Sequence, residues 1–265
     1  MPKKEPPPKV VLPYVTGSFH GKDAWRLALK RLASVLEVSL FYFLGSMLTN
    51  FNSLPGRLIP ALLLVGAAAA YQMLRGKAQG ASDVAYGETL YRRQAEGKDC
   101  GAEDRERSYH KLKGFFAALM GALPLVIVTA VFAALTGPIR YQLGALPAWT
   151  EELLGQSEWG DALRYYEQTV SVTALDVLRV VVRAMSMPMI SVAAWLGNDA
   201  VLLAERLTPL LVLLAPLAYG VGYLQGPDER ARVNGSIRQG VANKKRKENK
   251  ERKRRQASKT PERLI

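Results

Sequence analysis

Four long apolar runs constrain this chain more than any other feature of its sequence. Each is 17 to 22 residues long, and together they contain a single Asp, Glu, Lys or Arg, which is Glu37. Runs of this length match the hydrocarbon thickness of a bilayer, and a soluble domain of this size rarely needs four. The sequence therefore predicts an all-α, polytopic helical membrane protein with transmembrane helices at Leu32–Asn50, Leu58–Leu74, Phe115–Thr136 and Leu207–Gln225.

The distribution of basic residues predicts how these helices are oriented. Lys and Arg number 7 in residues 1–31, 9 in 75–114 and 14 in 227–265, but only 2 in 137–173. Positive charge beside a span is retained on the cytoplasmic side. We therefore expect a multi-pass protein of the cell (inner or plasma) membrane, with both termini and the middle segment in the cytoplasm.

These boundaries divide the chain into seven segments. The N-terminal segment is predicted to have extended, proline-containing residues followed by an interfacial helix anchored by Trp25. Four-residue spacings of small residues, such as Gly222 to Gly226, predict close contacts between helices. The segments are a cytoplasmic N-terminus (1–31), a transmembrane hairpin (32–74), a cytoplasmic helical loop (75–114), a third transmembrane helix (115–136), an extracytoplasmic acidic loop with an amphipathic or re-entrant segment (137–206), the last transmembrane helix (207–226) and a disordered polybasic tail (227–265).

A fifth apolar segment, Ala174–Gly197, is harder to place. A fifth full span would put a basic segment on the outer side, and Pro188 interrupts the segment about halfway. Two short helical arms favour an amphipathic or re-entrant hairpin entered from the outer face. A true fifth span is the alternative.

Within this segment Asp176, Arg179 and Arg183 recur at the spacing of one helix face. Two guanidiniums one turn apart form a candidate anion-binding site, because they can clamp a phosphate or carboxylate while Asp176 orients the first of them. The alternative is contact with outer lipid headgroups or with the acids between Glu151 and Glu167.

Glu37 is the one acid inside a predicted span. A carboxylate within a membrane is a candidate for handling protons or cations. The alternative is that it reaches the inner interface or pairs with Arg75 or Lys113, which are expected at that level.

Other side chains give little sign of metal, cofactor or catalytic chemistry. Met185, Met187 and Met189 carry soft thioethers, but alternating methionines on a helix point in different directions, and His20 and His110 are isolated. The sequence has no phosphate-binding glycine loop, nucleophile elbow or His-Glu-x-x-His motif. We therefore expect a protein that is not an enzyme and holds neither a metal nor a cofactor.

The basic tail is the remaining candidate for binding. It has three interpretations: adhesion to anionic lipid headgroups, electrostatic contact with ribosomal RNA, or orientation of the protein alone. It has no aromatic residue after Lys244, so contacts to a nucleic acid would involve the phosphate backbone. The candidate contact residues are Lys244, Lys245, Arg246, Lys247, Lys250, Arg252, Lys253, Arg254 and Arg255.

Two functional classes follow from these observations. The first is a structural or accessory subunit that engages a protein partner, anionic lipid or a ribosome through its cytoplasmic loop and basic tail. The second is a small transporter or channel component, in which Arg179, Arg183 and Glu37 line a path for anions or protons. The sequence favours the first and does not specify the oligomeric state.

Overall fold

The computed structural model describes residues 8–49, 51–137, 153 and 173–257. Helices account for 84% of this part of the chain, and it contains no strand, so the predicted all-α class is confirmed. The chain divides into two compact units. Unit 1 comprises residues 1–30, 70–120 and 216–265, and unit 2 comprises 31–69 and 121–215.

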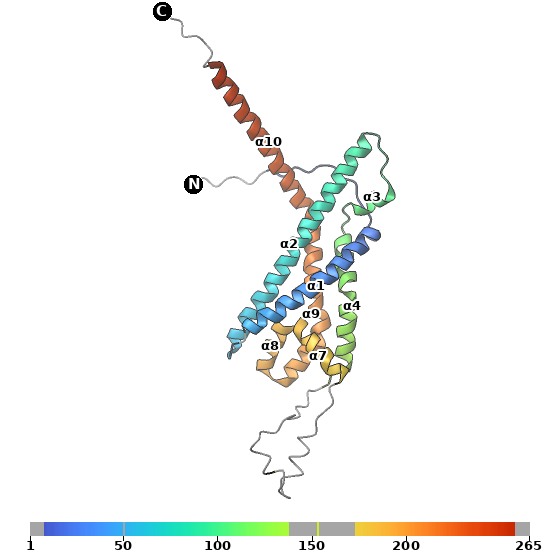
Figure 1. Cartoon of the computed structure of the whole chain (residues 1–265), viewed down its shortest axis with the longest axis vertical. Coiled ribbons are helices and arrows are strands. Elements are labelled where there is room, and N and C mark those ends of the chain that lie inside the picture. Colours follow the sequence, from blue (N-terminus) through green and yellow to red (C-terminus); the bar gives the residue numbers. More distant parts are fainter. Residues whose placement is uncertain (1–7, 50, 138–152, 154–172, 258–265) are drawn as a thin grey trace, which may run out of the picture. The chain divides into compact units, whose positions relative to one another are not determined.

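The described residues form eight helices of six residues or more (Figure 1). They are α1 (Lys22–Leu48), α2 (Leu54–Ala95), α3 (Ala102–Arg107), α4 (Lys113–Leu135), α7 (Ala174–Met185), α8 (Met187–Leu196), α9 (Asn198–Leu224) and α10 (Gly226–Ala257).

Three of the described helices, α2, α4 and α9, are long and apolar enough to cross a membrane. The number rises to four if α7 and α8 together form one bent span. α1, which is 27 residues long, is not among them. The structure thus supports a membrane protein, while the predicted set of four spans is not confirmed.

Unit 2 exposes much of its apolar surface. Its small buried clusters include Val35 with Ala122 and Val212, and Val38 with Ala215. Many large apolar side chains of the same helices face outward, as expected where lipid rather than water surrounds a helix. Examples from α1, α2, α4 and α9 are Leu40, Leu44, Leu62, Leu63, Ile127, Val131, Leu203 and Leu210.

The break predicted near Pro188 is confirmed. α7 ends at Met185, and α8 begins at Met187 with Pro188 in its first turn, where the missing N–H of proline costs no helical hydrogen bond. The two helices meet at 102°, with Ser186 between them (Figure 1). The hydroxyl of Ser186 donates to the carbonyl of Val182 and lies 3.2 Å from the Thr208 hydroxyl of α9, so this buried corner has polar partners.

In unit 1, glycines bring the second half of α2 against the end of α9 and the start of α10. A Cβ added to Gly222 would meet the carbonyl of Met73, and one added to Gly226 would lie 2.6 Å from the Cα of Gly80. The predicted close contact at this pair of small residues is confirmed. Gly66, another residue of the predicted kind, faces open space instead.

The N-terminal segment of unit 1 is extended and is held by main-chain hydrogen bonds. The amides of Val10, Val15 and Gly17 donate to carbonyls of Ala231, Gly87 and Tyr109, at 3.0, 3.2 and 2.9 Å. Tyr109 stacks on Tyr223 with ring centroids 5.2 Å apart. Burial raises the pKa of the Tyr109 phenol from its ordinary value of 10.0 to about 12.

The structure differs from the sequence prediction for the basic tail, because residues 226–257 form the helix α10 where disorder was predicted. The segment is rich in Lys, Arg, Gln, Glu and Ala, which are strong helix formers, and it has no proline after Pro227. Asp228 and Glu229 at its start and Arg254 and Arg255 at its end also complement the helix dipole.

Candidate functional site

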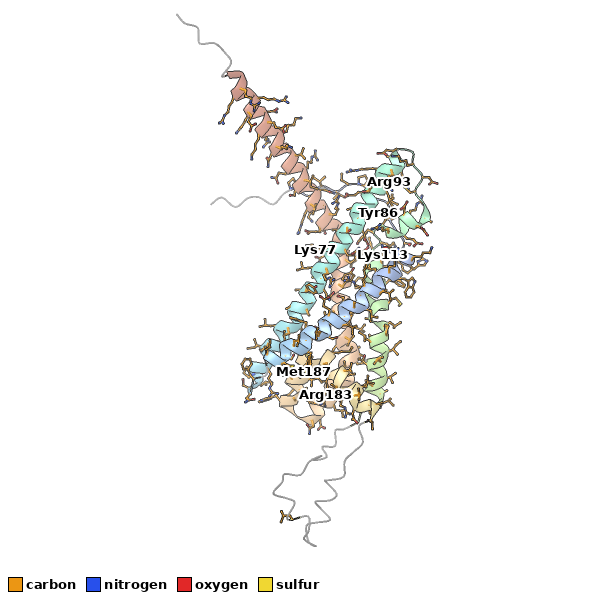
Figure 2. The ribbon with its side chains drawn as sticks, viewed as in Figure 1. Lys77, Tyr86, Arg93, Lys113, Arg183 and Met187 are labelled. Carbon is orange, nitrogen blue, oxygen red and sulfur yellow. The ribbon has the colours of Figure 1, made fainter. Side chains whose placement is uncertain are left out.

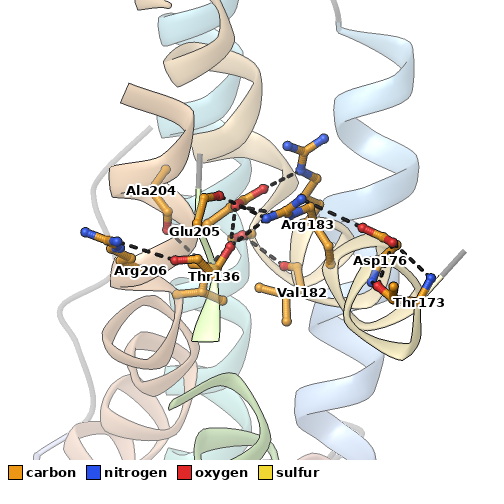
Figure 3. A network of polar contacts seen from close by, with 12 residues as sticks. Thr136, Thr173, Asp176, Val182, Arg183, Ala204, Glu205 and Arg206 are labelled. Carbon is orange, nitrogen blue, oxygen red and sulfur yellow. Dashed lines mark hydrogen bonds and ion pairs between the residues drawn. The ribbon is translucent and has the colours of Figure 1, made fainter. Parts of the chain in front are cut away.

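Glu205 of α9 is the centre of the polar network in unit 2 (Figure 3). Its side chain is fully buried and lies between Arg179 and Arg183 of α7. The Nε of Arg183 donates to Oε1 at 2.6 Å, and the hydroxyl of Thr136 donates to Oε2 at 3.2 Å. A buried carboxylate is stable only when it is paired and hydrogen-bonded, and these partners meet that requirement.

Arg179 is largely buried and has several partners. Its Nε lies 3.5 Å from Oε2 of Glu205, while one amino group donates to the Thr136 hydroxyl at 2.8 Å and to the Gly137 carbonyl at 3.1 Å. The guanidinium also lies 5.9 Å from the ring centre of Phe132. Arg179 therefore joins α7, α9 and the end of α4.

Arg183 and Asp176 are at the more accessible side of this network. The Arg183 side chain is 33% exposed, and within the described residues it pairs with Glu205 through its Nε. Asp176 lies 3.9 Å from Arg179 and forms a reciprocal N-terminal cap with Thr173 of α7. The cap explains why α7 begins at Ala174, and the i, i+3, i+7 spacing explains why the three predicted residues share one face.

Sequence reasoning placed Arg179, Arg183 and Asp176 together but missed Glu205. The missed residue lies two positions before the predicted last span, which began at Leu207, although α9 in fact begins at Asn198. An acid at the edge of an apolar run, opposite an arginine pair that needs a counter-charge, was the available signal. The acids between Glu151 and Glu167, proposed as partners instead, lie outside the described residues.

A second buried charge, Lys113, is the first residue of α4 in unit 1 (Figure 2). Its side chain is fully buried, and its ammonium lies 2.7 Å from Asp23 of α1 and 3.3 Å from Asp83 of α2. It also donates to the carbonyls of Glu106 and Arg107. Lys113 was considered from the sequence only as a partner of Glu37, and its two acids were missed.

The first turns of α10 are clamped to α2 in unit 1. Arg230 donates twice to Oε2 of Glu88, at 2.9 and 2.7 Å, and Asn234 donates to Oε1 at 2.7 Å. Lys77 pairs with Glu229 at 3.0 Å. Glu88 is buried, so these charge-assisted bonds fix the direction in which α10 leaves.

Beyond this clamp, every residue from 236 to 255 is exposed. This part of α10 has 10 Lys or Arg against two acids, Glu248 and Glu251. From Lys244 onward, helical spacing separates these charges into two faces. One combines both glutamates with Lys244, Lys245, Arg252 and Arg255, and the other is only basic. We call the second face the basic stripe; it consists of Arg246, Lys247, Lys250, Lys253 and Arg254.

The remaining candidates have less distinctive surroundings. Glu37 is exposed on α1, between the buried residues Val35 and Val38. Met185 is buried beside Ala122 and Val212, as expected for apolar packing. Among the described residues, no group of three or more His, Cys, Asp or Glu could hold a metal ion.

Comparison of the chain with models of known protein families, with curated proteins and with solved structures finds no match.

Proposed function

We propose that this protein is a non-enzymatic accessory subunit of a cell membrane, which engages a polyanionic partner through α10. The observation that carries the proposal is a basic helix that is clamped at its base and exposed along residues 236–255. Such a helix presents positive charge at a fixed place without burying apolar surface. Anionic lipid headgroups and ribosomal RNA both offer the complementary surface.

The Glu205 network supports an accessory role over an anion path. Both guanidiniums already bind a buried carboxylate, so an anion in transit would compete with Glu205 for them. The polar residues of the network face one another between helices, while Val177, Val180 and Val181 are exposed on the outside of α7. This arrangement suits a structural connection between helices within a membrane.

For the topology we propose four spans, α1, α2, α4 and α9, with both termini cytoplasmic and α7–α8 as a hairpin on the outer side. Three of these helices are apolar enough by themselves. Support for α1 comes from its outward-facing Leu36, Leu40, Phe41, Leu44, Met47 and Leu48. An even number of spans also keeps the three most basic segments on one side.

Cysteine labelling in intact cells tests this topology. Cys100 is buried and would resist a reagent on either side, so it is first replaced by Ser. Single cysteines are then introduced at the exposed positions Asn52, Glu96 and Asn249. We expect an impermeant thiol reagent to modify only the cysteine at position 52, and modification at position 249 would contradict the proposal.

Two matched variants of the full chain test docking by α10. One replaces four residues of the basic stripe by Gln, and the other replaces four basic residues of the opposite face, so that both lose the same charge. The first is Arg246→Gln, Lys250→Gln, Lys253→Gln and Arg254→Gln, and the second is Lys244→Gln, Lys245→Gln, Arg252→Gln and Arg255→Gln.

Binding of each variant to ribosomes and to vesicles with phosphatidylglycerol is measured over a range of salt concentrations. We expect the stripe variant to lose more affinity for one of these partners than the opposite-face variant does. Its slope of log affinity against log salt concentration should be smaller by about 3. Equal losses in both variants would assign the effect to net charge alone. Unchanged binding in both would contradict a docking role for α10.

A further inference from the structure

Unit 1 contains a cavity of about 930 Å³ that neither the Glu205 network nor α10 explains. Its walls are the first turns of α1, the second half of α2, and α3. The volume is within the range of small-molecule sites in proteins. The Lys113 ion pairs lie beside it and hold α1 and α2 to the start of α4, so the walls are fixed by buried contacts.

The cavity is lined by charges of both signs. Lys22, Arg26 and Lys30 follow one another at four-residue intervals along α1, and α3 contributes the acids Glu103, Asp104 and Glu106. In total, four basic and five acidic residues line the cavity. A ligand with only negative or only positive charge would meet repulsion from one wall, so this lining favours a zwitterion.

The two walls differ in how far their charges are already satisfied. Lys22 pairs with Glu103 at 3.1 Å, and Asp104 accepts a hydrogen bond from Tyr86 at 2.7 Å. The side chains of Arg26 and Lys30 form no hydrogen bond or ion pair with any described residue. These two cations are about 6 Å apart along the helix axis and are therefore available to bind a phosphate together.

The same turns of α1 carry exposed apolar groups. Trp25 is 55% exposed and Leu29 is 71% exposed. Tryptophan and aliphatic residues alternating with Arg and Lys are typical of a helix at the level of lipid headgroups. A lipid headgroup could therefore enter the cavity while its acyl chains stay in the bilayer.

We propose that this cavity binds a phosphodiester with a free primary amine, the chemistry of a phosphatidylethanolamine headgroup. The phosphate lies between Arg26 and Lys30, and the ammonium lies toward Glu103 of α3. The Lys22–Glu103 pair is exposed and therefore weak, so the ammonium can take the place of Lys22. The cavity is separate from the basic stripe, and its test is independent of the docking role.

The test is native mass spectrometry of the purified full chain in detergent, with short-chain phosphatidylethanolamine, phosphatidylcholine and phosphatidylglycerol. The first variant is Arg26→Gln with Lys30→Gln, and the second is Glu103→Gln. The control, Arg92→Gln with Arg93→Gln, removes the same charge from exposed positions of α2 that do not line the cavity. Glycerophosphoethanolamine is a soluble probe of the same headgroup.

We expect phosphatidylethanolamine to bind at least about tenfold more tightly than the other two lipids, because only its ammonium has three N–H donors beside a phosphate. The first variant should lose this preference, Glu103→Gln should weaken it, and the control should keep it. Equal binding of all three lipids, or a preference that survives in the first variant, would overturn the proposal. Equal affinity for the soluble probe would support the headgroup chemistry and assign the ligand to a soluble source.

Discussion

The two buried charge centres of this protein are opposites. In unit 1 a buried base, Lys113, is bound by two acids, and in unit 2 a buried acid, Glu205, is bound by two bases. Each central side chain is fully buried, and each joins helices that are far apart in sequence. They differ in how completely the central charge is enclosed by hydrogen-bonding groups.

Lys113 has main-chain carbonyls as partners in addition to its two carboxylates. Glu205 has one hydroxyl, and the side chain of Arg183 on its outer side is one-third exposed. A charge with more of its partners inside the protein has fewer ways to be compensated by solvent when one partner is removed. The comparison therefore predicts that the two centres respond to mutation with different severity.

The largest effect is expected for Lys113→Met. The change leaves Asp23 and the buried Asp83 without their counter-charge and the carbonyls without a donor, so the free energy of unfolding should fall by about 3 to 5 kcal/mol. Detergent-based equilibrium unfolding would measure it. The exposed neighbour provides the control, Lys111→Met, and a loss equal to that of the control would contradict the central role of Lys113.

A smaller loss, about 3 kcal/mol, is expected when Arg179→Gln and Arg183→Gln are combined. Both cations of Glu205 are then absent, and a buried carboxylate remains. Adding Glu205→Gln should recover most of the lost stability, because the uncompensated charge is removed. If the triple variant is no more stable than the double variant, the ion pairs are not the source of the effect.

The acids of Lys113 allow a comparison within one centre. The Asp83 side chain is 5% exposed and that of Asp23 is 35% exposed. We expect Asp83→Asn to cost about 2 kcal/mol and Asp23→Asn about 1 kcal/mol, because solvent screens the second pair. Unfolding of the two single variants under the same conditions decides this, and the reverse order would show that exposure does not set the strength of these pairs.

The smallest effect is expected for the surface pair Lys9–Asp228, which serves as a reference for both centres. Hydrogen bonding to Lys9 lowers the pKa of Asp228 below its ordinary value of 3.8. The contribution of the Lys9–Asp228 pair to stability is therefore complete above pH 3.8 and is lost as the pH falls through the lowered pKa. The protection factor of the Val10 amide, which is the intrinsic exchange rate at each pH divided by the observed rate, should fall only in acid. Asp228→Asn should show the lower protection factor already at neutral pH.

Much of the fold could be predicted from the sequence, because it follows from local patterns. The apolar runs predict helices, and Pro188 predicts the break between α7 and α8. The face shared by Asp176, Arg179 and Arg183 follows from helical spacing alone. These inferences compare residues that are near one another in the chain.

The partners of the buried charges could not be predicted in the same way. Lys113 is 90 residues from Asp23 and Arg183 is 22 residues from Glu205, so each pairing depends on helix packing. The helical state of the tail was missed for a different reason. Low hydrophobicity argued against a packed core, but helix propensity and the clamp at Glu88 do not require one.

Because α10 is a continuous helix clamped at its base, it fixes both the distance of the basic stripe from the clamp and the direction in which the stripe faces. The basic stripe begins 20 residues after Gly226, which places Arg246 about 30 Å along the helix axis from its start. A flexible chain of that length would sample many distances, whereas a continuous helix holds its charges at one. Removing a single residue between Asn234 and Arg246 would shorten the helix by only about 1.5 Å but turn the stripe by about 100°. The direction in which the protein presents its charge is thus set by the number of residues in that interval.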